Sequence, residues 1–264
     1  MSTEELNWME NFLLSIEKED KNTDEFRYPF SSTFLERNAN VHLDISAIVN
    51  RLENAHMIID KCLANDCNHE NELDSSLSTS FFSITDEELG NCFIWKSHNE
   101  TGTFTDYDYY IKIRGFIDTA DLLIKNNNLS CNTKIYPILF LCRHSIELCM
   151  KRILFYSIKS DNQIVDKLKK PSHSLLKIWN KVNNCFDILR ETLPNCKNGL
   201  DEIYKRIIEL HNIDKNGDSF RYPTNLDLDY RFNNKTLDFN IIYMFMISTF
   251  GFFDACFHAI NEGL

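Results

Sequence analysis

The chain has 264 residues, a formal net charge of −11, and only 7 Gly and 5 Pro. Turns depend on Gly and Pro, and an all-β protein needs a turn about every ten residues, so this shortage favours long helices. Hydrophobic residues make up 43% of the chain and include 20 Phe and 10 Tyr, which excludes a largely disordered protein. The acidic balance excludes a general nucleic-acid coat protein, although it leaves room for a small local basic site.

Nine cysteines occur without a C-x-x-C pair, and the tightest group, Cys62, Cys67 and His69, has no obvious fourth ligand. We therefore expect no metal site and no cofactor. Residues 1–10 contain three Glu and no basic segment, so no secretory signal is expected. The longest uncharged run, residues 239–253, has fifteen residues and is too short to span a bilayer. Free thiols without a signal or a membrane span are typical of a cytoplasmic protein.

Two helices are expected in the N-terminal third. Residues 3–18 carry apolar side chains at helical spacing. A second helix is expected over roughly residues 33–64, where seven positions follow a strict 4,3,4,3 spacing: Val41, Ile45, Ile48, Leu52, Ala55, Ile59 and Cys62. This is a heptad seam. We interpret it as an intramolecular helix–helix contact rather than a free coiled coil, because coiled coils usually run longer.

A polar segment separates this third from the rest of the chain. Residues 65–106 are rich in Asn, Asp, Ser and Thr and have no helical periodicity. Short strands are expected near residues 81–84 and 92–95. Residues 1–105 are therefore expected to form a helical extension with an irregular polar segment.

Residues 106–264 are expected to form a bundle of five helices, which makes the fold class all-α. The helices cover, in chain order, about 107–125, 134–158, 172–182, 198–212 and 237–261. The helix over 134–158 is the most apolar and should lie at the centre of the bundle. Ser172 or Ser174 is the expected N-cap of the helix that follows.

The expected central helix carries four polar residues within an otherwise apolar sequence. At 100° per residue, with Arg143 at zero, Glu147 lies at about 40°, Lys151 at about 80° and His144 at about 100°. One interpretation is an Arg–Glu–Lys ladder on a partly solvated helix face. The other is a polar cleft, in which Glu147 positions Arg143 and His144 for acid–base or phosphate chemistry.

A second group of polar residues is the segment Phe220-Arg221-Tyr222-Pro223. The residue before a proline favours an extended conformation, so this segment is expected to be a rigid turn that directs Arg221. Its guanidinium could bind a phosphate, or it could form a salt bridge to Glu147 or another carboxylate that faces the core. The pattern Asp-x-Phe-Arg-Tyr-Pro also occurs at residues 24–29, which suggests a degenerate repeat.

Three segments in order resemble the HEPN superfamily of small helical bundles. They are RHSIELCMKRIL at residues 143–154, HSLLKIW at residues 173–179, and the Arg-Tyr-Pro turn at residues 221–223 before a closing apolar helix. The resemblance covers about residues 107–262. It implies an all-α bundle in which Glu147 and Lys151 belong to the family's second helix and His173 starts the next one.

The resemblance also implies an activity. Many HEPN proteins are metal-independent RNases of toxin–antitoxin and antiviral systems, in which an Arg-x4–6-His motif near the start of the last helix meets its copy across a dimer interface. The Arg holds phosphate and the His assists attack by the ribose 2′-OH. This sequence departs from that pattern, because the expected last helix has no Arg and its His258 lies far from its start. Arg-x4-His pairs occur elsewhere, at Arg37–His42, Arg51–His56 and Arg206–His211.

Three functions therefore stay open. The first is a metal-independent endoribonuclease of a bacterial antiviral or toxin system, acting on RNA as a homodimer, with an operon-encoded protein as a further expected partner. Its candidate catalytic residues are Arg143, His144, Glu147, Arg221, Arg206 and His211, and its candidate binding residues are Lys151, His173 and Tyr222. The second is a catalytically inactive HEPN-like module that binds a nucleotide or a partner protein. The third is a structural helical adaptor.

Overall fold

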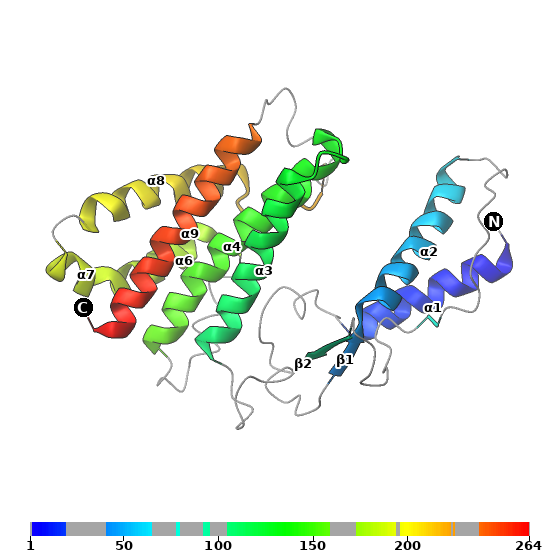
Figure 1. Cartoon of the computed structure of the whole chain (residues 1–264), viewed down its shortest axis with the longest axis horizontal. Helices are drawn as coiled ribbons and strands as arrows, with labels where there is room; N and C mark the ends of the chain where they lie inside the picture. The colour runs from blue at the N-terminus through cyan, green and yellow to red at the C-terminus, as the bar shows by residue number, and fades with distance from the viewer. Residues whose placement is uncertain are drawn as a thin grey trace. The chain divides into compact units, whose positions relative to one another are not determined.

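The computed structural model describes residues 2–19, 41–64, 78–79, 92–95, 105–158, 173–193, 196–222, 224 and 238–263. This part of the chain is all-α apart from two four-residue strands, which agrees with the scarcity of Gly and Pro. It divides into two compact units, Met1–Phe104 and Thr105–Leu264 (Figure 1). We refer to them as the N-terminal unit and the helical unit.

The N-terminal unit contains two helices, α1 (Thr3–Glu19) and α2 (Ile45–Ala64), which pack around a small apolar core. The core consists of Trp8, Phe12, Ala55 and Ile58. An ion pair of 2.9 Å between Lys61 Nζ and Glu5 Oε1 joins the same two helices. Both groups are largely shielded from water, so this pair is screened less than a surface ion pair.

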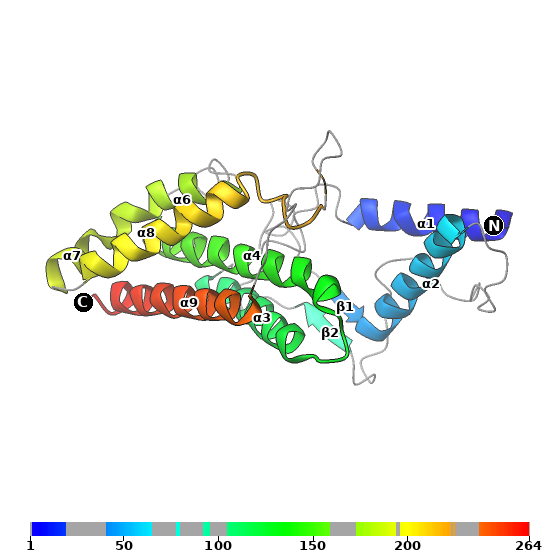
Figure 2. The ribbon, with the colours of Figure 1, turned by 90° about the horizontal axis from the view of Figure 1, so that it is seen from above.

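The heptad seam expected on α2 does not form the contact with α1. Ala55 is 8% exposed, whereas Ile45, Leu52 and Ile59 are 53%, 48% and 49% exposed. The prediction of an intramolecular seam is therefore wrong for most of its length. The two helices are inclined to one another in both views (Figures 1 and 2), so α1 covers only a short stretch of α2 beside Ala55 and Ile58.

The N-terminal unit also contains a two-stranded antiparallel sheet. β1 (Val41–Asp44) pairs with β2 (Cys92–Trp95), with Val41 opposite Trp95. The strand expected near residues 92–95 is confirmed, whereas the one near residues 81–84 lies outside the described residues. The expectation that helix continues through residues 41–44 is wrong. The strand conformation there depends on a partner distant in sequence, which local periodicity does not report.

The helical unit is built around α4 (Cys131–Ile158), which confirms its expected central place. Every residue from 142 to 154 is buried. α3 (Asp106–Lys125) and α9 (Phe239–Glu262) pack against α4 on one side, and α6 (Leu175–Val182) packs on the other. Figure 2 shows α4 between these two layers.

α8 (Cys196–Ile213) packs on α6 and completes the second layer. Between them lie a short 3-10 helix, η2 (Asn183–Phe186), and α7 (Asp187–Thr192), neither of which was expected. Ser174 rather than Ser172 is assigned as the N-cap of α6, because its side chain accepts from the backbone N–H of Lys177.

α9 is long and apolar enough, judged by length and composition, to cross a membrane. Core helices of soluble proteins pass the same test, and 28% of its most apolar window is buried here. The expectation that the chain does not span a membrane therefore stays a prediction. On its buried side α9 contributes Met246, Thr249, Phe253, Cys256 and Phe257 to the bundle.

Candidate functional site

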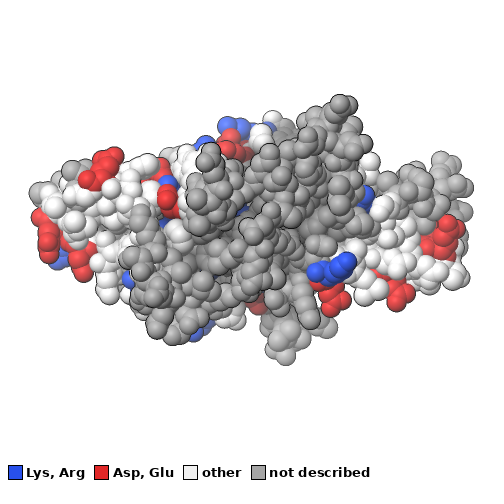
Figure 3. All heavy atoms as spheres, turned by 90° about the horizontal axis from the view of Figure 1, so that it is seen from below, with Lys and Arg blue, Asp and Glu red and all other residues white. Residues whose placement is uncertain are grey.

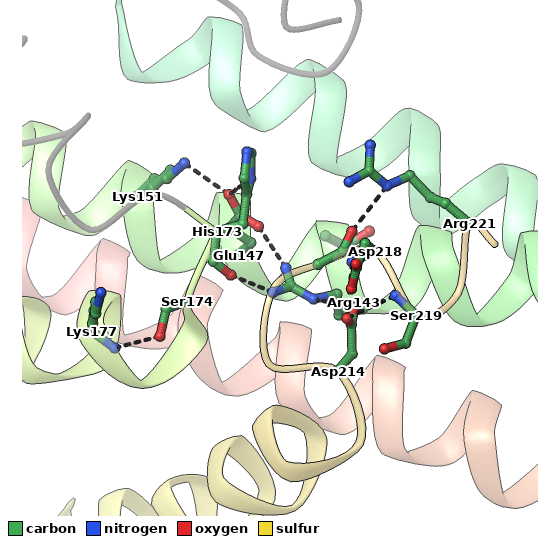
Figure 4. Close-up of polar contacts among 12 residues, drawn as sticks. Arg143, Glu147, Lys151, His173, Ser174, Lys177, Asp214, Asp218, Ser219 and Arg221 are labelled. Atoms are coloured by element: carbon green, nitrogen blue, oxygen red, sulfur yellow. Dashed lines mark hydrogen bonds and ion pairs between the residues drawn. The ribbon is translucent and has the colours of Figure 1, made fainter. Parts of the chain in front are cut away.

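Three charged side chains one turn apart on α4 form a buried ladder (Figure 4). Arg143 Nη1 donates to Glu147 Oε2 at 2.5 Å, and Lys151 Nζ donates to Glu147 Oε1 at 2.8 Å. The i,i+4 spacing brings these partners together on one helix face. The side chains of Arg143, Glu147 and Lys151 are only 3%, 1% and 8% exposed. The ladder therefore lies inside the bundle rather than on a partly solvated face.

Asp214, directly after α8, supplies Arg143 with a second carboxylate. Its Oδ2 lies 2.9 Å from Arg143 Nε. Its Oδ1 accepts from the backbone N–H groups of Asp218 at 2.9 Å and Ser219 at 3.0 Å. One buried carboxylate thus fixes both the arginine of α4 and the loop that follows α8. Sequence reasoning missed Asp214; the Asp-x-x-Gly spacing to Gly217, typical of a turn, is the signal that could have identified it.

Gly217 allows this loop to lie against α4 and the start of α6. Its φ is +78°, a conformation that other L-residues rarely adopt. A Cβ atom there would lie 3.1 Å from His173 Cβ and 3.3 Å from Arg143 Nη2. Both the backbone conformation and the close approach therefore require glycine.

His173, just before α6, contacts the ladder through its backbone and its side chain. Its carbonyl oxygen accepts from Arg143 Nη2. Its Nδ1 lies 3.4 Å from Glu147 Oε1, and its side chain is 26% exposed. A carboxylate behind one ring nitrogen orients an imidazole and fixes which nitrogen faces outward. His173 therefore connects the buried network with the surface.

The charged state of Glu147 follows from its neighbours. Burial by itself would raise the pKa of this carboxyl, but the Lys151 ammonium, the His173 contact and the Arg143 guanidinium outweigh it and hold the pKa well below its usual range. Glu147 is therefore ionised at neutral pH and pairs with both cations of the ladder. Burial, together with the charge of the same carboxylate, raises the pKa of the Tyr109 hydroxyl on α3 well above its usual value.

Arg221 and Tyr222 lie where the loop after α8 returns to the surface. The preceding Phe220 is 4% exposed and anchors the turn, whereas Tyr222 is 55% exposed. Arg221 Nε donates to the Gly217 carbonyl at 3.0 Å, and the guanidinium carbon lies 5.6 Å from the centre of the Tyr222 ring. This geometry directs the rest of the Arg221 guanidinium away from the loop backbone.

The expected salt bridge between Arg221 and Glu147 is not among the ion pairs of the described residues. Arg143 and Lys151 occupy the Glu147 carboxylate instead. In Figure 4 the Arg221 guanidinium, the Lys151 ammonium and the His173 ring point toward the same side of the network. These side chains come from three segments distant in sequence, and Lys151 among them is paired with Glu147.

His144 lies against aromatic rings, and its effect on the ladder is electrostatic, as one of the groups that lower the pKa of Glu147. It is 3% exposed, and its ring lies 5.2 Å from that of Phe116 and 5.6 Å from that of Phe140, with which it stacks. Phe116 belongs to α3, so His144 faces the first layer of the bundle. An arc of about 100° is wide enough to contact two different neighbours of a central helix.

The structure separates the roles of Arg206 and His211, which both lie on α8. Arg206 Nη1 donates to Ser248 Oγ at 2.5 Å and to Thr249 Oγ1 at 3.2 Å, which ties α8 to α9. Burial and the nearby positive charges of Arg143 and Lys215 lower the pKa of the His211 imidazole. His211 is therefore neutral at pH 7 and lies near the Arg143 network.

The Arg51–His56 pair offers no comparable site. Arg51 is 3% exposed and its Nε donates to the Ser78 carbonyl at 2.8 Å, whereas His56 lies 3.1 Å from Asp60 on the exposed surface of α2. The Arg37–His42 pair cannot be placed, because Arg37 lies outside the described residues. The same holds for Cys67, His69 and the first Asp-x-Phe-Arg-Tyr-Pro segment. Within the described ranges no group of three or more His, Cys, Asp and Glu side chains is arranged to hold a metal ion.

Figure 3 shows where the described charged side chains lie on one face of the molecule. On the face in Figure 3 the described Lys and Arg side chains occur in small separate patches among acidic ones, with no broad basic stripe.

A comparison of the chain with models of known protein families, with curated proteins and with solved structures finds no match. The class that fold and site define is an all-α protein whose central helix carries a buried Arg–Glu–Lys ladder, joined by an Asp from the loop after α8.

Proposed function

We propose that the helical unit is a HEPN-like module that binds the phosphate groups of a nucleotide or of RNA beside α4. The observation that carries this proposal is that Arg221, Lys151 and His173 lie on the same side of the buried network in Figure 4, with the Arg221 fork directed away from the loop that holds its Nε. An arginine fork is suited to bidentate binding of phosphate oxygens. Within the described part of the chain the Nη groups of Arg221 have no hydrogen-bond partner, because only its Nε donates, to Gly217.

The burial of the two residues that were first expected to be catalytic favours binding over catalysis. Arg143 and His144 are 2% and 3% exposed. Arg143 already donates to Glu147 and to the His173 carbonyl and pairs with Asp214. Neither side chain can reach the backbone of an RNA without breaking this packing. Arg143 is better described as the residue that holds the site together.

A titration of the purified full chain with a single-stranded RNA and with a nucleoside triphosphate, in EDTA, tests the proposal. Arg221→Ala should weaken binding roughly 10- to 100-fold, the usual effect of losing a charge-assisted contact. Arg114→Ala is the matched control, because Arg114 is partly exposed and pairs with Asp118 within α3. Equal affinities for the wild type, Arg221→Ala and Arg114→Ala would overturn the proposal, as would absence of binding by the wild type.

Metal-independent RNA cleavage is the second candidate, and one observation favours it. The Nδ1 of His173 lies 3.4 Å from an ionised carboxylate and the ring is partly exposed, which suits a general acid or base. In this reaction the ribose 2′-OH would lose its proton and attack the adjacent phosphorus. The 5′-oxygen would leave with a proton, giving a 2′,3′-cyclic phosphate and a 5′-OH end.

Incubation with total RNA in EDTA distinguishes the two candidates. Cleavage that is lost in His173→Ala but kept in His144→Ala would support catalysis by the exposed histidine. Cleavage that persists equally in both variants would remove His173 from that role. Absence of cleavage together with Arg221-dependent binding would leave the binding module. A role in a bacterial antiviral or toxin system, with a homodimer and an operon-encoded partner, is proposed from the resemblance alone.

A further inference from the structure

The outer face of α2 carries a row of exposed side chains with heptad spacing. Ile45, Val49, Leu52, Ile59 and Leu63 are 53%, 45%, 48%, 49% and 77% exposed. With His56, whose side chain is 76% exposed, they follow one another at intervals of 4, 3, 4, 3 and 4 residues. We call these six residues the outer stripe of α2. It differs from the seam expected from the sequence, with which it shares only Ile45, Leu52 and Ile59.

Among the described residues of the N-terminal unit, more large apolar side chains are exposed than are buried in its core. Its core contains Trp8, Phe12, Ala55 and Ile58. Its exposed large apolar residues are Leu6, Leu13, Leu14, Ile45, Val49, Leu52, Ile59 and Leu63. Large contiguous apolar surfaces on soluble proteins mark interaction sites, so this distribution indicates that the stripe is covered in the functional state.

The spacing of the stripe and the charges beside it indicate which kind of element packs on it. A row with heptad spacing fits a helix that repeats the same spacing. If the stripe supplies positions a and d, the e positions include Glu53 and Asp60, whereas the g positions are Ile48, Ala55 and Cys62. In a parallel pair of identical helices e faces g of the other copy, so no like charges meet. In an antiparallel pair e faces e, and the acidic residues would repel one another.

His56 falls on an a position in the middle of the stripe. A single polar residue at such a position fixes the register of two helices, because any shift places it against an apolar layer. The register that pairs His56 with His56 also pairs each apolar position with its own copy.

We propose that the outer stripe of α2 is a dimerisation surface, on which α2 of a second copy of this chain packs in parallel and in register. This places a dimer contact in the N-terminal unit, independently of the phosphate site of the helical unit. The interface is isologous, since each residue of the stripe meets its own equivalent.

Sedimentation equilibrium of the full chain tests the proposal. The wild type should have about twice the 31.1 kDa mass of the chain. Leu52→Asp combined with Ile59→Asp should raise the dissociation constant by about 100-fold or more, because each buried charge enters the symmetric interface twice. Asn50→Asp, which adds a charge at an exposed position of α2 outside the stripe, should leave the mass unchanged. A monomeric wild type, or a dimer that survives the double substitution, would overturn the proposal.

Two substitutions of opposite charge at one position distinguish a loss of dimerisation from a loss of folding. Leu52→Lys and Leu52→Asp should each be monomeric alone, whereas an equimolar mixture should form a heterodimer, because residue 52 of one copy faces residue 52 of the other. A misfolded variant could not be restored in this way. Failure of the mixture to associate, while each variant keeps its helical circular dichroism spectrum, would contradict parallel in-register pairing.

Discussion

Replacing Glu147 with glutamine tests whether the buried carboxylate holds the centre of the helical unit together. The change keeps the shape of the side chain but removes its negative charge, while Arg143 and Lys151 stay buried beside it at 2.5 Å and 2.8 Å. Breaking a buried ion pair by removing one partner typically costs about 3–5 kcal/mol. Asp214 still neutralises part of the Arg143 charge, so we expect a loss of about 3 kcal/mol in the free energy of unfolding.

Thiol labelling in increasing urea measures the unfolding of the helical unit itself, separately from that of the N-terminal unit. Cys142 and Cys149 lie on α4 and are 5% and 4% exposed, and burial raises the pKa of the Cys142 thiol to about 12. Both should therefore react with a maleimide only when the helical unit opens. The control is Glu202→Gln, which removes a solvent-exposed pair with Lys205 and should not shift the midpoint measurably. A Glu147→Gln midpoint equal to that of the wild type would refute the reasoning.

The same substitution predicts a pH dependence with a definite sign. The folded-state pKa of Glu147 lies below its ordinary value of 4.5. Its contribution to stability is therefore complete above pH 4.5 or so and is lost as the pH falls through that value toward the folded-state pKa. The stability difference between the wild type and Glu147→Gln should shrink as the pH is lowered from 6 to 3. A difference that stays constant over this range would show that the charge of Glu147 does not contribute.

Three further substitutions test other contacts of the bundle. Gly217→Ala should lower the free energy of unfolding by about 1–2 kcal/mol, because the φ of +78° at this position is unfavourable for alanine. The thiol-labelling assay measures this loss, and an unchanged urea midpoint would contradict the requirement for glycine. Asp238→Ala removes the N-cap side chain of α9, which accepts from two backbone N–H groups. It should lower the free energy of unfolding by about 1 kcal/mol and speed hydrogen exchange in the first turn of α9 only. Arg152→Met removes a guanidinium whose carbon lies 3.6 Å from the centre of the Phe257 ring and whose Nη1 lies 2.9 Å from Asp254 Oδ1. We expect the free energy of unfolding, measured in urea, to fall by about 2 kcal/mol. An unchanged value would show that these contacts make no net contribution to stability.

Much of the helical unit could be predicted from the sequence, because its helices are encoded locally. The apolar run of α4, the capping Ser174 and the shortage of Gly and Pro all act within a few residues of one another. Periodicity and caps report such local preferences directly. The i,i+4 spacing likewise predicted that Arg143, Glu147 and Lys151 would interact. It could not tell that they are buried.

Contacts between residues distant in sequence were decided by the tertiary structure alone. Asp214 approaches Arg143 because α8 and its loop return to α4, and no local pattern encodes that approach. β1 forms because β2 lies beside it, although the apolar spacing around residues 41–44 also suits a helix. The α2 seam fails as an intramolecular contact because α1 is inclined to it and covers only part of its length. A helix repeat determines which residues share a face, but only the arrangement of neighbouring elements determines what that face meets.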